Sequence, residues 1–123
     1  MTINLPLPPS VNKYYRHIVI RKAPRTLISS DGREYRQAVI DSFRLQFPDH
    51  KPMTGRLSVF VELFPRDRRK TDVDNYAKPL LDGMTHAGVW LDDSQIDHLT
   101  LFRSAIVTGG ACTVTVEELE ARQ

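Results

Sequence analysis

One run of alternating residues constrains the fold of this chain more than any other feature. Within residues 56–64 every second side chain is aliphatic, from Leu57 through Leu63, and the side chains between them include Ser58 and Glu62. Successive side chains of a strand point to opposite faces, so this period predicts a strand with one buried face. Such a strand must belong to a sheet that has other elements packed against its apolar side.

Two segments have the spacing of amphipathic helices. The first is expected to open at Asp31, because Asp31 and Glu34 have the Asp-x-x-Glu spacing of a capping box, and to stop at Pro48. The second covers roughly residues 74–87. Pro79 lies inside it and indicates either a distorted first turn or a later start of the regular helix.

The remaining segments complete an α+β pattern with a mixed sheet. Residues 3–7 predict a short edge strand, and residues 10–30 predict a long basic loop or a pair of short strands. Residues 98–107 and 111–119 are expected to be strands joined by a hairpin turn at Thr108-Gly109-Gly110. The expected order is strand, helix, strand, helix, strand, strand, with two main helices packed on the sheet.

Composition excludes several classes of protein. Hydrophobic residues make up 41% of the 123 residues, and no apolar run approaches the roughly 18 residues of a membrane-spanning helix. Cys112 is the only cysteine, which excludes an internal disulfide framework and a cysteine zinc cluster. Residues 1–6 lack the basic and apolar regions of a secretion signal. We therefore expect one domain over residues 1–123, in the cytoplasm and without a membrane partner.

Charge is distributed unevenly along the chain. Residues 1–30 contain five bases and no acid, whereas the other 93 residues carry 12 bases and 15 acids. Six of the ten aspartates fall between Asp72 and Asp97. A basic segment beside an acidic cluster indicates a polyanionic partner and a cation held by carboxylates, although ordinary scatter of solvated charge has the same composition.

The acidic cluster centres on a strand-to-helix junction. Asp72 and Asp74 are two residues apart, and in an extended segment such a pair points to one side and can share a cation. Asp92 and Asp93 supply further carboxylates, and Lys78 follows Asp74 by one helical turn. An all-oxygen set favours Mg²⁺, with Mn²⁺ as a substitute. The structural alternative assigns these residues to a helix cap, an ion pair between Asp74 and Lys78, and a solvated turn.

Bases close to this cluster favour the metal-site interpretation. Four of them precede Asp72 within about 25 Å of extended chain. Bases that hold a phosphodiester, beside carboxylates that hold a metal ion, suit hydrolysis of a nucleic acid. The expected DNA-binding residues are Lys13, Arg16, Arg66, Arg68, Arg69 and Lys70, and the same surface is expected to include Arg21, Lys22 and Arg25.

Three blocks of the sequence carry a resemblance to a known family. They cover residues 5–17, 65–78 and 87–95, and with their surroundings they span about residues 5–119. The second block contains a basic stretch followed by Asp-x-Asp-Asn and a lysine, and the third contains Trp-Leu-Asp-Asp. Each block alone has low specificity, but together and in this order they resemble the RusA family of Holliday junction resolvases.

The resemblance implies a RusA-like, homodimeric fold and a Mg²⁺-dependent endonuclease that acts on four-way DNA junctions in recombination and repair. By motif position it makes Asp72, Asp74 and Asp93 the metal-binding catalytic aspartates and Lys78 an essential lysine. Two symmetric cuts require two sites, which a two-fold dimer provides. Asp93 either returns to Asp74 within its own chain or comes from the partner subunit.

Three other functions remain open at this point. They are a broader structure-specific DNA nuclease, a non-catalytic junction-binding protein and a small nucleotide phosphohydrolase. The absence of a glycine-rich phosphate loop disfavours the last. Mg²⁺-dependent nicking of junctions, compared with flaps and plain duplex, distinguishes the others.

Overall fold

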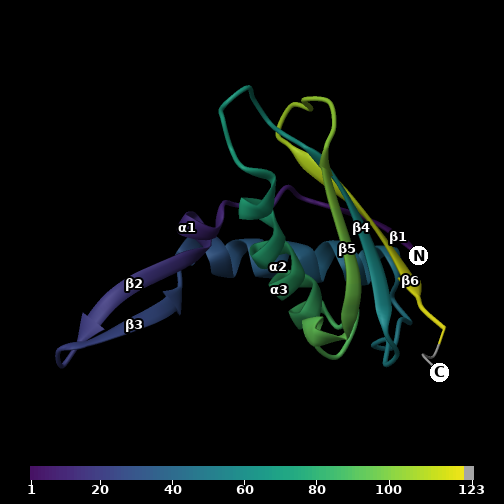
Figure 1. Ribbon diagram of the computed structural model, residues 1–123, viewed down its shortest axis with the longest axis horizontal. Helices are drawn as coiled ribbons and strands as arrows, with labels where there is room; N and C mark the ends of the chain where they lie inside the picture. Colours follow the sequence, from purple (N-terminus) through teal and green to yellow (C-terminus); the bar gives the residue numbers. More distant parts are fainter. Residues whose placement is uncertain (121–123) are drawn as a thin grey trace.

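The computed structural model describes residues 1–120 and shows a four-stranded sheet, two long helices on one side of it and a separate hairpin (Figure 1). The elements in chain order are β1 (Thr2–Leu5), α1 (Val11–Tyr14), β2 (Tyr15–Ile20), β3 (Ala23–Ile28), α2 (Ser30–Gln46), β4 (Leu57–Phe64), the 3-10 turn η1 (Val73–Tyr76), α3 (Ala77–Ala87), the 3-10 turn η2 (Asp93–Gln95), β5 (Ile96–Arg103) and β6 (Ala111–Glu118). The strand order is β1-β6-β4-β5, with β4 and β5 parallel and the other pairs antiparallel. The predicted α+β fold with a mixed sheet and two main helices is therefore confirmed.

The alternating run forms the central strand of the core. The side chains of Leu57, Val59, Val61 and Leu63 on β4 are completely buried. Val39 and Phe43 of α2, with Leu80 and Met84 of α3, belong to the same apolar cluster. Each fully buried aliphatic side chain contributes about 1.5–3 kcal/mol, so this strand is a principal source of stability. The period-two prediction is confirmed.

The first long helix begins one residue earlier than expected and with a different cap. Ser29 is the N-cap of α2, and its hydroxyl accepts a hydrogen bond from the Gly32 backbone N–H at 3.0 Å. The prediction of a capping box opened by Asp31 is wrong, because Ser29 is the N-cap and Asp31 lies inside the first turn of the helix. The helix ends at Gln46, shortly before Pro48, as expected.

The second long helix begins after a tighter turn. Residues 73–76 form η1, and α3 starts at Ala77, so Pro79 is its third residue. The first N–H groups of a helix have no intrahelical acceptor, so proline is tolerated there. The expected later start of the regular helix is confirmed, and Gly88 ends it with φ +82°. Within residues 1–120 no helix is long and apolar enough to cross a membrane.

Residues 10–30 form the short helix α1 and a hairpin. The predicted pair of short strands is confirmed as β2 and β3, which pair only with each other, whereas α1 was not expected. The two residues at the tip, Arg21 and Lys22, have φ of +50° and +64°. A non-glycine residue in this left-handed region is strained by about 1–2 kcal/mol.

The last two strands do not form the predicted hairpin. Strand β4 lies between β5 and β6, so the connection over residues 104–110 crosses the end of β4. It is fixed there by hydrogen bonds from Ser104 N–H to the Leu63 carbonyl (2.7 Å) and from Val107 N–H to the Pro65 carbonyl (2.9 Å). The glycines do make a turn, with φ of +82° and +72°. Turn residues mark where the chain reverses, but they do not specify which strand it pairs with next.

Candidate active site

Asp72 and Asp74 lie at the start of the helical segment that leads into α3. Asp72 is the N-cap of η1 with extended φ and ψ of −69° and 139°, and Asp74 is the second residue of the turn. The expectation that both lie in an extended segment is therefore wrong, because the 3-10 turn starts between them. Both side chains are exposed, so solvent and ligands reach them.

The structural alternative for this pair is not supported. Asp72 makes no side-chain capping hydrogen bond, and Asp74 is not a cap of either η1 or α3. The ion pair between Asp74 and Lys78 does not form, and neither carboxylate pairs with any base in the part of the chain that is described. Two unpaired, neighbouring carboxylates suit Mg²⁺, which binds through one or two carboxylates and keeps waters and substrate phosphate oxygens.

The two aspartates of the second acidic pair differ, because the Asp92 carboxylate has a structural role whereas the Asp93 carboxylate is available to a ligand. Asp92 is the N-cap of η2, and its carboxylate accepts a hydrogen bond from the Ser94 hydroxyl at 2.6 Å. That hydrogen bond lowers the pKa of Asp92 below its usual value. For Asp92 the structural alternative is therefore correct. Asp93 follows as the first residue of η2 and is exposed.

Gln95 holds this turn in place, a role that the sequence analysis missed. Its side-chain oxygen accepts from the N–H groups of Leu91 and Asp92 at 2.9 and 2.8 Å. Its amide nitrogen donates to the carbonyls of Met53 and Gly55, both at 2.9 Å. The Asp-x-x-Gln spacing of a capping box was the available signal. Gln95 thereby fixes the backbone that carries Asp93.

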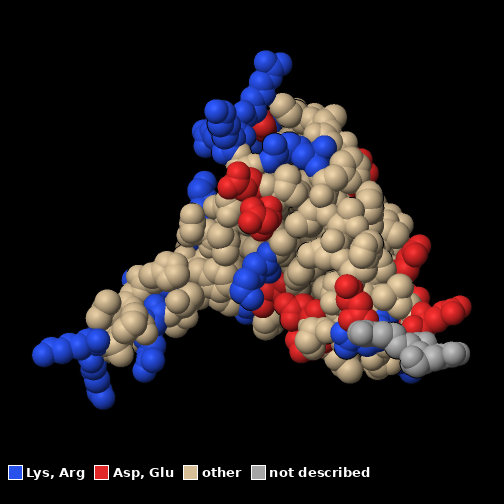
Figure 2. All heavy atoms as spheres, viewed as in Figure 1, with Lys and Arg blue, Asp and Glu red and all other residues tan. Residues whose placement is uncertain are grey.

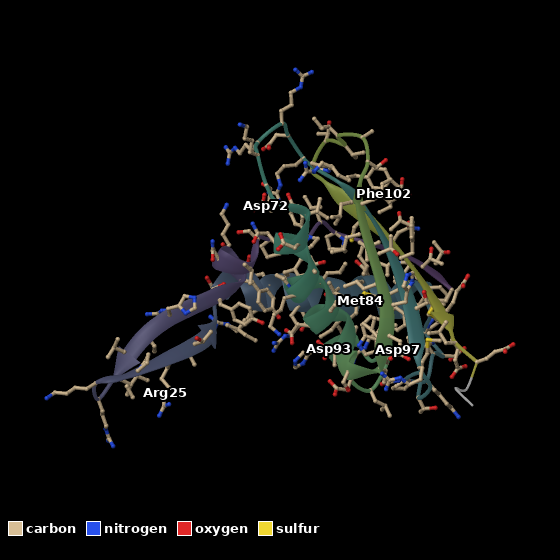
Figure 3. All side chains as sticks on the ribbon, in the orientation of Figure 1. Arg25, Asp72, Met84, Asp93, Asp97 and Phe102 are labelled. Atoms are coloured by element: carbon tan, nitrogen blue, oxygen red, sulfur yellow. The ribbon has the colours of Figure 1, made fainter. Side chains whose placement is uncertain are left out.

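The three predicted aspartates do not meet within one chain. Figure 3 shows Asp72 at one end of α3 and Asp93 beyond the other end. The 11 residues of α3 separate these ends by about 16 Å at ~1.5 Å per residue. Among the residues described, no three acidic, histidine or cysteine side chains are grouped so that they could hold a metal ion. Of the two possibilities that the sequence left open, the one in which Asp93 returns to Asp74 within its own chain is therefore not observed.

Some of the predicted DNA-binding residues come together near the first acidic pair. All six are exposed. Lys13, Arg66 and Arg69 line one cavity of about 550 Å³ that also reaches Thr71, the residue before Asp72. Figure 2 shows basic atoms at this end of the molecule with acidic atoms directly beside them. The Arg103 guanidinium donates to the Thr71 carbonyl and thereby connects the end of the basic loop of residues 66–70 to β5.

A polar cluster connects the three helices. The Asp82 carboxylate on α3 accepts hydrogen bonds from the Tyr14 hydroxyl and from the Arg36 guanidinium (2.8 Å). Burial raises the pKa of Asp82, but the two hydrogen bonds and the charge of Arg36 outweigh burial and leave the pKa below its usual value. Burial and Asp82 together raise the pKa of Tyr14. These residues come from α1, α2 and α3, so no local spacing in the sequence could have indicated the cluster.

Comparison with known proteins decides the family. The sequence model of the family described as Endodeoxyribonuclease RusA matches residues 6–117. The chain belongs to the RusA family. The match covers every residue proposed above for the site, so the RusA resemblance expected from three short blocks extends over nearly the whole chain.

Three relatives give the extent of the similarity. Proteins named crossover junction endodeoxyribonuclease RusA from Shigella sonnei (strain Ss046) and Escherichia coli (strain K12) are 35% and 34% identical to this chain over 118 residues. Each alignment covers 96% of this chain and 94% of the relative. The protein of the same name from Enterobacteria phage 82 is 35% identical over 117 residues, which covers 95% of this chain and 93% of the relative.

Proposed function

We propose that residues 1–123 form one endonuclease domain that works as a homodimer and resolves four-way DNA junctions by paired, Mg²⁺-dependent hydrolysis of phosphodiesters. The observation that carries the proposal is the pair of exposed, unpaired carboxylates of Asp72 and Asp74 beside the basic loop, in a chain of the RusA family. The relatives' names, which describe nucleases acting at crossover junctions, support junctions as the substrate.

Each group at this site has a distinct task in the proposed reaction. The carboxylates of Asp72 and Asp74 hold the ion, and the exposed bases of the 66–70 loop hold the DNA backbone on either side of the cut phosphate. When bound, Mg²⁺ or Mn²⁺ neutralises a nonbridging oxygen and makes a bound water more acidic. Lys78, exposed in the first turn of α3, stabilises negative charge that develops on the phosphate or orients the water.

We further propose that Asp93 completes the site of the partner subunit. In support of this, Asp93 lies beyond the C-terminal end of α3 while Asp72 and Asp74 precede its N-terminal end. A two-fold axis that places two copies of α3 antiparallel brings the end of one helix beside the start of the other. This arrangement makes two equivalent sites, which is what two symmetric cuts require. Dimerisation then has a catalytic reason in addition to symmetry.

A nicking assay on a synthetic four-way junction tests the proposal. Wild-type protein is expected to cut only when Mg²⁺ or Mn²⁺ is present, and chelation is expected to abolish cutting while leaving junction binding. Asp74→Asn is expected to bind but not to cut, because one oxygen ligand is neutralised. Correctly folded Asp74→Asn protein that cuts at the wild-type rate would contradict the assignment of the site.

The same assay separates the alternatives. Equal cutting of junctions, flaps and plain duplex would favour a broader nuclease, and binding without any metal-dependent cut would favour a junction-binding protein. Sedimentation tests the dimer, and an active enzyme that is strictly monomeric would refute it.

A further inference from the structure

The β2–β3 hairpin, called here the arm (residues 15–28), projects from the body and does not join the four-stranded sheet (Figure 1). Its base is fixed, because Tyr15 and Ile28 pack on the core and the Ser29 N–H donates to the Tyr14 carbonyl at 2.9 Å. From the base to the tip, strands of six residues extend about 20 Å. A hairpin held firmly at one end can therefore present its tip to a partner.

The arm is cationic along its length. Arg16, Arg21, Lys22 and Arg25 are all exposed, and residues 1–30 contain no acid. None of the four forms an ion pair with an acid anywhere in the described chain. Figure 2 shows basic atoms protruding from the arm. Uncompensated positive charge on a narrow ribbon suits a polyanion, because binding releases the counterions of the polyanion.

The turn at the tip contains residues that its backbone disfavours. Arg21 and Lys22 both have positive φ, which is the geometry of a two-residue loop that usually contains Asn-Gly. Backbone strain of this kind is found where the side chains serve a function. Two cations thus occupy the outermost positions of the arm although a more relaxed turn was available.

Apolar side chains flank these cations. Val19 is 72% exposed and Ile20 is 48% exposed. Val19 is paired with Pro24 on one face of the arm, and Ile20 is paired with Ala23 on the other. A two-stranded ribbon fits the grooves of DNA, and apolar side chains of DNA-bending proteins insert where bases are unstacked. Bases are most accessible at the branch point of a junction.

We propose that the arm is a second DNA-binding element, in which Arg21 and Lys22 bind phosphates and Val19 and Ile20 pack on bases at the branch point. The proposal rests on the proposed function, since it takes branched DNA as the ligand. A protein partner would have to supply acids to neutralise four cations that the complex would bury, whereas a phosphodiester backbone carries that charge itself.

Replacing the tip by its relaxed counterpart tests the arm. The variant Arg21→Asn/Lys22→Gly removes both charges and supplies Asn-Gly, so its thermal midpoint should equal or exceed that of the wild type. Junction binding is measured by fluorescence anisotropy with chelator present, over a range of salt concentrations. The salt slope should fall by about 1.8 for each arm that contacts the junction, and affinity at about 0.1 M salt should fall on the order of 10–100-fold for each such arm.

A matched control removes the same charge elsewhere. Arg44 and Lys51 are exposed, and Arg44 lies in the last turn of α2, about 21 Å from the end of that helix where the arm is attached. Arg44→Asn/Lys51→Gly is therefore expected to bind the junction with wild-type affinity and slope. A tip variant that binds as well as this control overturns the proposal for the cations.

Two further readouts separate the remaining outcomes. With 2-aminopurine at the branch point of the junction, binding of the wild type should raise the 2-aminopurine fluorescence, and binding of Val19→Thr/Ile20→Thr should raise it less. Equal fluorescence increases for the two proteins overturn the role of the apolar side chains. Loss of dimer in sedimentation of the tip variant, with unchanged affinity for the junction, would make the arm a contact between copies. If only the proposal for the arm is wrong, the wild-type protein still nicks junctions. If the proposed function is wrong, the wild-type protein does not nick them.

Discussion

Mixing two inactive variants tests whether Asp93 acts in the partner's site. One subunit carries Asp74→Asn and the other carries Asp93→Asn, and each variant alone is expected to be unable to cut. The reason is the distance between the two side chains: α3 separates the segment that carries Asp74 from the one that carries Asp93 by about 16 Å, whereas Mg²⁺ binds oxygen at about 2.0–2.1 Å. A single chain in this conformation therefore cannot use both side chains on one ion.

The size of the recovery follows from the two-fold arrangement. In a mixed dimer one site receives both changes, and the other receives Asp74 from one subunit and Asp93 from its partner, so it is intact. Random pairing of equal amounts makes half of the dimers mixed, and about a quarter of all sites are therefore expected to be restored. Each mixed dimer has one working site, so the product should be a nicked junction instead of two symmetric cuts.

The assay is junction cleavage by the variants, alone and after exchange of subunits, with different affinity tags to show that mixed dimers form. Circular dichroism and thermal midpoints close to wild type show that both variants fold. If Asp93 acts within its own chain, every mixed dimer has two defective sites. Mixed dimers that are isolated and remain inactive would refute the cross-subunit site.

Two further predictions concern the scaffold that positions the site. Asp82→Asn should lower the free energy of unfolding by about 1–3 kcal/mol near pH 7, because hydrogen bonds to a charged group from Tyr14 and Arg36 are weakened. Because the pKa of Asp82 is lowered in the folded state, its charge stabilises the fold above the ordinary carboxyl pKa of about 3.9, and this stabilisation is lost as the pH falls further. Denaturation of the variant between pH 5 and 2 should therefore depend less on pH than that of the wild type. An equal dependence would refute this role of Asp82. Gly88→Ala should lower the free energy of unfolding by about 1–2 kcal/mol through the backbone φ of +82° alone. The added Cβ would lie 3.9 Å from Pro52, which is ordinary contact and adds no clash. Denaturant titration, with an unchanged slope, checks this.

The sequence by itself determined the local features of this protein. The period of two over residues 57–63 was sufficient to identify β4, because alternation depends only on the geometry of an extended chain. Pro48 and Pro79 indicated where the regular helices end and begin, because a proline has no backbone N–H to donate. The neighbouring carboxylates of Asp72 and Asp74 and the bases before them were also visible directly, since they are adjacent in the chain.

The tertiary structure alone decided how distant segments meet. Strand β5 pairs with β4 instead of β6, and Asp93 lies at the far end of α3 from Asp72. The cluster of Tyr14, Arg36 and Asp82 joins residues up to 68 positions apart. These outcomes depend on which surfaces bury the most apolar area together, and that is a property of the whole chain. Spacing in the sequence reports interactions within a few residues and carries no information on such pairings.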